Sequence, residues 1–279
     1  MFLIFPFSFF LSIFPPSASA QRIAILTLDK TEASRDFAEK LGEQLARNTT
    51  ILDFSLAESA YHAVSSATPF NLTTEESKRL GEAIGCDFFI LIRSATLRRS
   101  SFQVAEYYES YASIFLVSSR SGRLVLWNLP KFDASKRSAA GKMLSDSVEQ
   151  IAAKIIESAR TAKSEEIGAR DEVFIEEVPE GNSPEAKNFR SPVPFRRIKP
   201  EYTAEAAFYD VAATVDIVVD LDASGRILRT RIVRWAGYGL DESVEKTVRA
   251  MNWLPATRNG KSLPIRFLLR YNFKKMEKE

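Results

Sequence analysis

Alternating apolar and polar positions mark the last third of the chain. One such run has apolar residues at every second place, namely Ala213, Val215, Ile217, Val219 and Leu221. A period of two predicts a strand with one buried face. Asp222-Ala223-Ser224-Gly225 has the residue types of a tight turn, so a second strand is expected over 226–234. The same alternation from 263 to 273 predicts a final strand.

A helix is expected between the second and the final strand. Gly237 and Gly239 interrupt the alternation, and Asp241 is placed to cap a helix. Its apolar residues then recur at helical spacing, at Val244, Val248 and Met251. The order strand, strand, helix, strand defines a ββαβ domain over 200–279.

This domain resembles the C-terminal domain of the TonB energy-transducer family over residues 200–274. The resemblance is carried by several motifs in order: Pro200-Glu201-Tyr202, Asp222 with Gly225-Arg226, Ala236-Gly237-Tyr238-Gly239-Leu240-Asp241, Trp253-Leu254-Pro255-Ala256, Asn259-Gly260-Lys261 and Tyr271-Asn272-Phe273. Two positions depart from the family pattern. Thr203 stands where a second proline is usual, and Trp235 stands where a small polar residue is common.

The resemblance implies a binding module without catalysis. In that family a short extended segment of an outer-membrane receptor adds as a strand to the sheet edge, through the final strand. We therefore expect a partner-binding edge over Pro264–Asn272. The outward residues of this edge are Arg266, Leu268, Arg270 and Asn272. The two arginines could pair with acidic residues of a partner, or could act as charges that keep a free edge from aggregating.

The first part of the chain predicts a mixed α/β domain over 21–160, a small sheet packed by helices. Strands are expected at Ile23–Leu26, Thr50–Asp53, Asp87–Ile92, Tyr111–Ser118 and Leu124–Trp127, and helices around Phe37–Leu45, after the Thr73 capping box, and over Ser138–Arg160. The segments Arg22–Leu26 and Leu80–Asp87 resemble the periplasmic α/β domain of TolB and of CsgG-like and penicillin-binding-protein activator lipoproteins. The whole chain is thus expected to be α+β.

Residues 161–199 have the composition of a linker. Acids dominate 165–185, every charge from 187 to 199 is positive, and prolines are interspersed. This pattern predicts an extended, flexible segment. Two other interpretations stay open: Val173-Phe174-Ile175 could add an edge strand to either domain, and the basic end could contact anionic lipid or peptidoglycan.

Residues 1–20 predict a Sec signal peptide. Phe2–Phe14 is nearly all apolar, and Ala18-Ser19-Ala20 fits a cleavage site before Gln21. The mature protein is then expected in the periplasm of a Gram-negative cell. The alternative is an uncleaved segment that anchors the chain in the inner membrane, although the apolar run is short for a membrane span.

Composition argues against catalysis and against nucleic-acid binding. His62 is the only histidine and Cys86 the only cysteine, so a catalytic triad or a metal centre lacks its usual residues. The net charge of +2 includes no basic stripe with interleaved aromatics. We expect no cofactor, no metal and no nucleic acid. Cys86 is expected to be a buried apolar residue, His62 a surface residue, and the tyrosines at 107, 108 and 111 strand-packing residues rather than a glycan-binding patch.

Together these features predict a non-enzymatic periplasmic adaptor that binds an envelope partner by strand addition. One alternative is an atypical energy transducer for receptor-mediated transport across the outer membrane. A coupled inner-membrane motor is doubtful because Met1–Phe14 lacks the histidine that the family carries in its membrane helix. A second alternative is a structural envelope protein that forms a homodimer through the C-terminal sheet.

Overall fold

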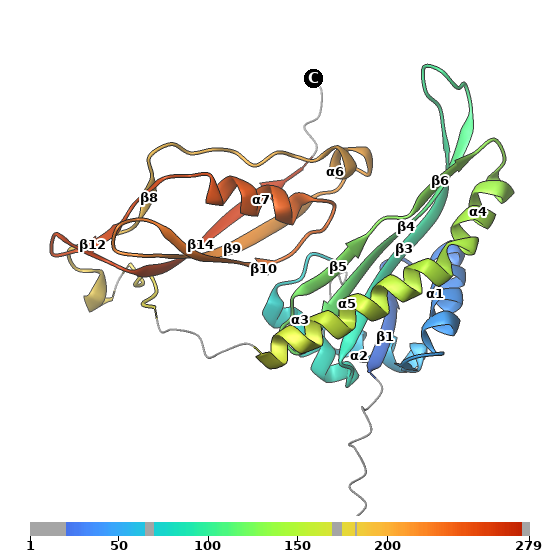
Figure 1. The fold of residues 1–279 in the computed structure, drawn as a ribbon, viewed down its shortest axis with the longest axis horizontal. Helices are drawn as coiled ribbons and strands as arrows, with labels where there is room; N and C mark the ends of the chain where they lie inside the picture. Colours follow the sequence, from blue (N-terminus) through green and yellow to red (C-terminus); the bar gives the residue numbers. More distant parts are fainter. Residues whose placement is uncertain (1–20, 65–69, 169–174, 182, 275–279) are drawn as a thin grey trace, which may run out of the picture.

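The structure, a computed structural model, has two α/β parts that lie side by side (Figure 1). It describes residues 21–64, 70–168, 175–181 and 183–274. The expected signal segment therefore lies outside the described residues. Within those ranges, no helix combines the length and the apolar character that a membrane crossing requires.

The N-terminal part is built on a six-stranded mixed sheet. Its strands run in the order β2-β1-β3-β4-β5, and β6 also pairs with β4. They are β1 (Arg22–Thr27), β2 (Thr50–Ile51), β3 (Phe88–Arg99), β4 (Tyr107–Ser118), β5 (Leu124–Asn128) and β6 (Lys131–Ala134). β1 is parallel to β2 and β3, whereas β3 and β4 form a long antiparallel pair. The sequence predicts β1, β2 and β5, but it predicts only residues 88–92 of β3 and 111–118 of β4.

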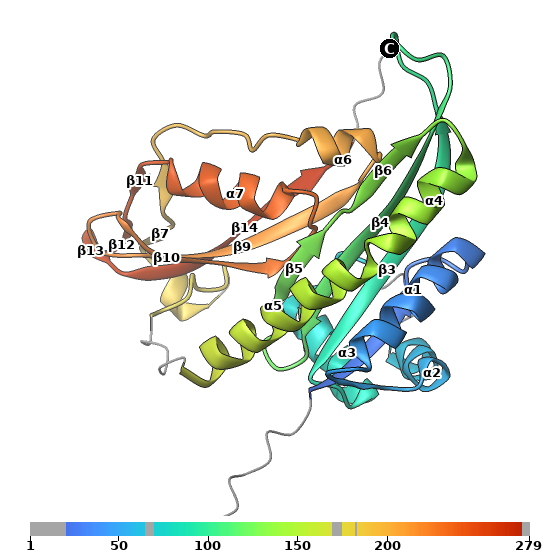
Figure 2. The same ribbon diagram turned by 45° about the vertical axis from the view of Figure 1, so that its right-hand side comes forward.

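Helices cover both faces of this sheet because successive strand residues point to opposite sides. Ile23 and Ile25 belong to an apolar cluster with α1 (Glu32–Leu45), α4 (Arg137–Asp146) and α5 (Val148–Gly168). Ala24 and Leu26 face the other way, into a cluster with α2 (Phe54–Val64) and α3 (Thr74–Ile84). Figure 2 shows α4 and α5 lying across β3 and β4.

The sequence predicts one helix from Ser138 to Arg160, and the structure has two. α4 ends at Asp146 and α5 begins at Val148. Between them, the hydroxyl of Ser147 donates to the carbonyl oxygen of Leu144 at 2.7 Å. Such a local hydrogen bond competes with the helical pattern of the backbone. α5 then continues to Gly168, into the stretch that the sequence marks as a linker.

The C-terminal part is a three-stranded antiparallel sheet with a helix on one face. The strand order is β10 (Ile227–Arg234), β9 (Ala213–Leu221), β14 (Ile265–Phe273), and α7 (Leu240–Arg249) covers the odd-numbered residues of β9. This arrangement confirms the ββαβ prediction. The sequence does not predict the short elements around it, which are η1 (Pro184–Ala186), β7 (Phe189–Arg190), β8 (Val193–Pro194), α6 (Ala204–Phe208), β11 (Trp253–Leu254), β12 (Ala256–Arg258) and β13 (Lys261–Leu263).

The two parts share one continuous apolar cluster. Trp235 is 1% exposed, and its ring centre lies 5.8 Å from that of Phe115 on β4. Its indole N–H donates to the hydroxyl of Ser77 on α3. Gly237 sits so close to β4 that a Cβ there would come within 2.6 Å of the Phe115 ring.

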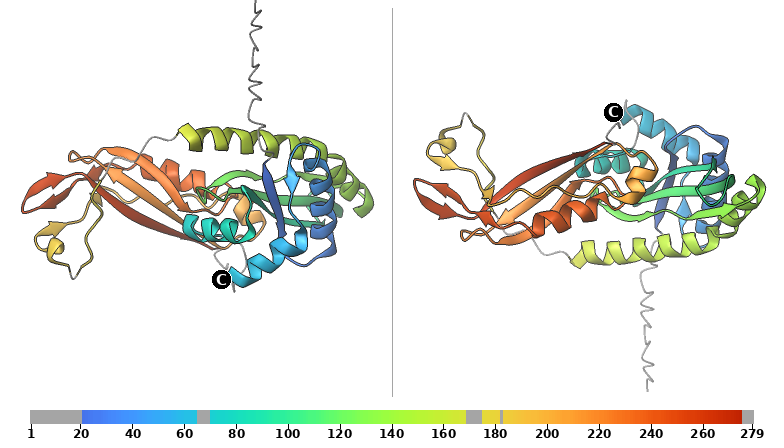
Figure 3. Two further views of the ribbon diagram at one scale, coloured as in Figure 1. Left: turned by 90° about the horizontal axis from the view of Figure 1, so that it is seen from below. Right: turned by 90° about the horizontal axis from the view of Figure 1, so that it is seen from above.

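Polar contacts reinforce this junction. The side chain of Asn71 donates to the carbonyl oxygens of Thr214 and Trp235, and it accepts from the N–H of Thr214. In both views of Figure 3 the C-terminal part, in orange and red, lies beside the N-terminal part, in blue and green. The C-terminal part is therefore docked on the N-terminal sheet by packing as well as by the chain connection.

The described part of 161–199 also differs from a simple extended segment. β7 pairs with β12, and β8 pairs with β11. Glu177 forms an isolated parallel bridge with Arg266 on β14. Low apolar content and prolines signal weak packing, but backbone pairing with a distant strand leaves no comparable pattern in the sequence. Of the expected edge strand Val173-Phe174-Ile175, the first two residues lie outside the described residues.

Candidate partner-binding site

β14 is an edge strand, and the pairing of Arg266 reveals which of its backbone groups face outward. The N–H of Arg266 donates to the carbonyl oxygen of Glu176 at 2.7 Å, and its own carbonyl oxygen accepts from the N–H of Val178 at 3.0 Å. Both bonds lie on the side away from β9. Backbone groups of residues two apart in a strand point the same way. The N–H and C=O groups of Leu268, Arg270 and Asn272 therefore also face outward.

These three outward positions form an open length of strand. Across the described ranges, β14 pairs with β9 over its whole length, and on its other side a backbone partner is present only at Arg266. An open edge of this kind is a template for pairing with another extended chain.

A groove of about 850 Å³ follows this edge. Six β14 side chains line it, alternately from the two faces of the strand: Phe267, Leu269 and Tyr271 from the helix side, and Arg266, Leu268 and Arg270 from the other. Because both faces contribute, the groove runs along the edge of the strand and does not lie on one face of the sheet. Its opposite wall is the segment from Ser191 to Lys199, which contains β8.

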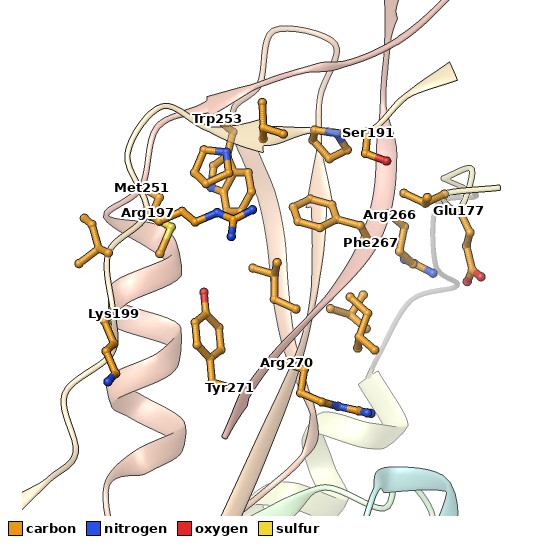
Figure 4. Close-up of a pocket in the computed structure, with 18 residues that line it drawn as sticks. Glu177, Ser191, Arg197, Lys199, Met251, Trp253, Arg266, Phe267, Arg270 and Tyr271 are labelled. Atoms are coloured by element: carbon orange, nitrogen blue, oxygen red, sulfur yellow. The ribbon is translucent and has the colours of Figure 1, made fainter. Parts of the chain in front are cut away.

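Two positively charged side chains lie on that wall. Figure 4 shows Arg197 and Lys199 on the side of the groove near Met251, with Glu177 on the far side near Arg266. No ion pair joins Arg197 or Lys199 to another described residue. The lining thus offers positive charge to an incoming segment, which favours an acidic one.

Trp253 gives the groove an aromatic floor. Its ring centre lies 5.0 Å from that of Phe267, and the residue is 5% exposed. Its indole N–H has no acceptor within the described part of the chain. A buried donor without a partner is uncommon, and this one borders the groove.

On the sheet face opposite α7, arginines and aspartates form two rows across the strands. Asp220 accepts from Arg266 at 2.7 and 2.9 Å and from Arg229 at 3.1 and 3.2 Å. Asp216 is held in the same way by Arg270 on one side and Arg234 on the other. Each row therefore ties β14 to β9 and β10 through one carboxylate.

The arginines set the ionisation of both carboxylates. Burial of Asp216 and Asp220 acts to raise the pKa of each, because only 3% of either side chain is exposed. The hydrogen bonds and charges of the flanking arginines outweigh this and hold the pKa of each carboxyl below its ordinary value. Both acids are therefore ionised at neutral pH.

The structure brings together three of the four expected edge residues at the groove. Leu268 is half exposed there, and Arg266 and Arg270 line it while pairing with Asp220 and Asp216. The arginines are thus engaged within the sheet and do not project freely toward a partner. Asn272 lies beyond the groove lining and accepts from the hydroxyl of Thr214 at 2.8 Å.

Sequence reasoning missed the rest of the groove. The alternation over 263–273 places Phe267 and Tyr271 on the buried face, and the composition of 161–199 places Arg197 and Lys199 in the linker. The run of positive charge over 187–199 is the one sequence signal for this wall of the groove. Its location opposite β14 depends on the pairing of β8 with β11.

Asp241 does not cap α7 as the sequence predicts. The N-cap is Gly239, in the left-handed conformation at φ 73°, and Asp241 lies in the first turn. Its carboxylate accepts from the N–H groups of Ala236 and Gly237, at 2.7 to 3.2 Å. Burial raises the pKa of Asp241 to about 7 despite these hydrogen bonds. The residue therefore fixes the loop that meets the N-terminal sheet.

The structure also places the other residues that the sequence singles out, namely Cys86, His62 and Tyr111. The Cys86 thiol is buried, as expected, and burial raises its pKa. His62 is exposed on α2, near Glu58. Tyr111 is buried against Tyr209 of the C-terminal part, with ring centres 4.7 Å apart. The described residues contain no cluster of histidine, cysteine and acidic side chains suited to a metal ion.

Comparison with known proteins identifies the C-terminal part. Residues 198–274, which are 77 of the 279 residues, match the family model described as the Gram-negative bacterial TonB protein C-terminal domain. No curated protein matches the chain.

Several solved structures are similar to parts of the chain. The TonB C-terminal domain of Pseudomonas aeruginosa is 17% identical, with 35% of this chain and 94% of that chain covered and a TM-score of 0.28. A hypothetical protein from Chlamydia trachomatis is 12% identical, with 50% and 99% covered and a TM-score of 0.34. A lipoprotein from Neisseria meningitidis is 15% identical, with 47% and 98% covered and a TM-score of 0.31.

The resemblance of residues 22–160 to the TolB and CsgG-like domains stays a prediction. The family match indicates that residues 198–274 are a non-enzymatic domain of a Gram-negative cell-envelope protein. The ββαβ fold, its open edge strand and the family match agree on the last part of the chain: residues 198–274 form a TonB-type C-terminal domain, attached here to an N-terminal α/β region.

Proposed function

We propose that this protein is a periplasmic adaptor that binds an extended segment of an envelope partner along the edge of β14. The observation that carries the proposal is the open edge itself. Leu268, Arg270 and Asn272 direct their backbone groups outward, beside a groove large enough for a short peptide segment. Strand addition would satisfy these groups and give affinity through backbone hydrogen bonds.

The side chains around the edge suggest which segment would bind. Alternate residues of an added strand face opposite sides of the sheet. One set would meet the aromatic floor at Phe267 and Trp253, and the other would meet Leu268 and the arginine rows. With Arg197 and Lys199 on the opposite wall, an acidic segment with interspersed apolar residues is the best complement. An outer-membrane receptor is one class of envelope protein that could supply it.

A second copy of the chain could occupy the same edge. Such a homodimer would pair β14 with β14 and would leave no room for a partner. Sedimentation of the purified protein separates the two cases, because self-pairing predicts a dimer whose population rises with concentration.

Site-specific photo-crosslinking in a Gram-negative host tests the proposal. A photoreactive amino acid is placed at Leu268 on the open edge, and in a matched variant at Leu228 on β10. Both side chains are about half exposed, at 50% and 57%. We expect a discrete adduct with an envelope protein from Leu268 and none from Leu228. Equal labelling from both positions, or no adduct from Leu268, would count against strand addition.

A further inference from the structure

Part of the β14 edge is already covered by the chain itself. Glu176, Glu177 and Val178 run parallel to β14 and bond to Arg266 through two backbone hydrogen bonds, of 2.7 and 3.0 Å. This segment precedes the C-terminal domain in the chain and lies where a strand added from a partner would continue past Leu268.

Side chains fix the segment in a specific register. The Glu176 carboxylate forms a two-pronged ion pair with the guanidinium of Arg258 on β12. Val178, two residues on, packs against the apolar cluster that includes Trp253. A bidentate arginine–carboxylate pair is both strong and geometrically selective. This end of the β14 edge therefore holds an acidic residue followed two positions later by an aliphatic one.

The covered length is short because the segment turns away. Pro179 follows Val178, and the carbonyl of Glu180 accepts from the N–H of Ser183 in a turn. The edge from Leu268 to Asn272 is thus left open next to a covered position at Arg266. An incoming strand could pair first with the open length and then displace Glu176–Val178.

We infer that Glu176–Val178 is an intramolecular competitor of the partner strand, and that the partner strand shares its pattern of an acidic residue two positions before an aliphatic one, parallel to β14. The inference rests on the proposed strand addition. A tethered segment acts at an effective concentration on the order of millimolar. The apparent affinity of a partner falls in proportion to the fraction of chains with a free edge. The segment would therefore prevent the binding of weak ligands. Only partner segments that also pair with the open length from Leu268 to Asn272 would bind.

A proline substitution separates the competitor from the edge. Val178→Pro removes the N–H that bonds to Arg266, whereas Glu177→Pro removes an N–H on the side away from β14. Both variants are made in the full chain, so that each carries one new proline in the same segment. Amide hydrogen exchange at Arg266 reports release of the segment, and fluorescence anisotropy of a labelled synthetic peptide of residues 175–180 reports access to the edge.

We expect faster exchange at Arg266 in Val178→Pro than in the wild type or Glu177→Pro. We also expect the peptide to bind Val178→Pro at least about tenfold more tightly than the other two proteins. A peptide with lysine in place of the residue that corresponds to Glu176 should lose this binding. Equal binding of the lysine peptide would overturn the proposed acidic pattern.

Two results would overturn the competitor itself. If exchange at Arg266 is the same in all three proteins, the segment does not hold the edge; crosslinking from Leu268 would then still test the proposed adaptor function alone. If exchange rises in Val178→Pro but the peptide binds none of the proteins, the uncovered edge does not accept strands at this position. That second result would count against strand addition as well as against competition.

Discussion

At the scale of single residues, Trp235 is central to the contact between the C-terminal domain and the N-terminal sheet. A small polar residue is common at this place in the family, but here the indole is buried between the two parts of the chain. It packs against Phe115 and donates to Ser77. A buried tryptophan contributes a large apolar area and one directed hydrogen bond. The residue that departs from the family pattern therefore lies in the interface with the N-terminal sheet.

Asp241 makes stability depend on pH in a direction opposite to most carboxylates. Its pKa is about 7 in the folded chain and close to 4 in an unfolded one. The contribution of its protonated form is fully present below pH 4 and is lost as pH rises through 7. From pH 5 to pH 8 we expect the stability of Asp241→Asn relative to the wild type to rise by about 2.5 kcal/mol. Urea unfolding at both pH values measures this difference.

Asp133→Asn is the control for this comparison. Asp133 is an exposed acid on β6, and it loses one charge by the same substitution. Its stability relative to the wild type should change little between the two pH values. A constant offset for Asp241→Asn at pH 5 and pH 8 would show that burial does not hold Asp241 protonated.

At the scale of elements, the arginine–aspartate rows decide how firmly β14 is held. Three strands meet at Asp220, whose carboxylate is almost fully buried between Arg229 and Arg266. Removing one partner from a buried ion pair costs far more than an exposed pair contributes, because the remaining charge stays out of water. The rows thus stabilise the strand that the proposed function uses.

We expect Asp220→Asn to lower the free energy of unfolding by about 3 kcal/mol at pH 7. Asp133→Asn, at an exposed position on β6, should change it by less than about 0.5 kcal/mol. Because the arginines hold the pKa of Asp220 below its ordinary value, its contribution is present above pH 4 and is lost as pH falls. The difference between wild type and Asp220→Asn should therefore shrink below pH 4, as followed by chemical denaturation. A difference that stays constant in acid would contradict the role of the ion pairs.

At the scale of the whole molecule, the two parts are joined by a packed junction that constrains where the β14 edge lies. Gly237 is central to it, with φ of 68° and with Phe115 and Trp127 too close for any side chain. The open edge is then presented at a fixed position relative to the N-terminal sheet. A fixed edge loses less freedom on binding than one on a flexible tether.

Gly237→Ala tests this junction. The added Cβ would meet the Phe115 ring at 2.6 Å and the Trp127 ring at 2.8 Å, so we expect the C-terminal part to undock. The matched control is Gly260→Ala, at φ 78° with no atom within 4 Å of the new Cβ, which adds only backbone strain. Small-angle scattering should show a larger radius of gyration for Gly237→Ala alone. Equal radii for the two variants would mean that the parts do not depend on this contact.

The sequence predicts most of the C-terminal domain because its signals are local. The alternation over β9 and β14 and the helical spacing in α7 are each contained within one element. The junction and the groove are non-local. Trp235 is visible in the sequence as a departure, but its neighbour Phe115 lies 120 positions away. Glu176–Val178 is too short for any periodicity, and its pairing with Arg266 follows only from the assembled sheet.

The most direct test of the account is residue-resolved amide exchange along β14, with and without the envelope protein that is crosslinked from Leu268. The N–H groups of Leu268, Arg270 and Asn272 face outward, whereas those of Phe267, Leu269 and Tyr271 bond to β9. We expect only the outward set to gain protection when the partner binds, so that the change alternates along the strand. Protection that rises equally at both sets, or at neither, would contradict strand addition at this edge.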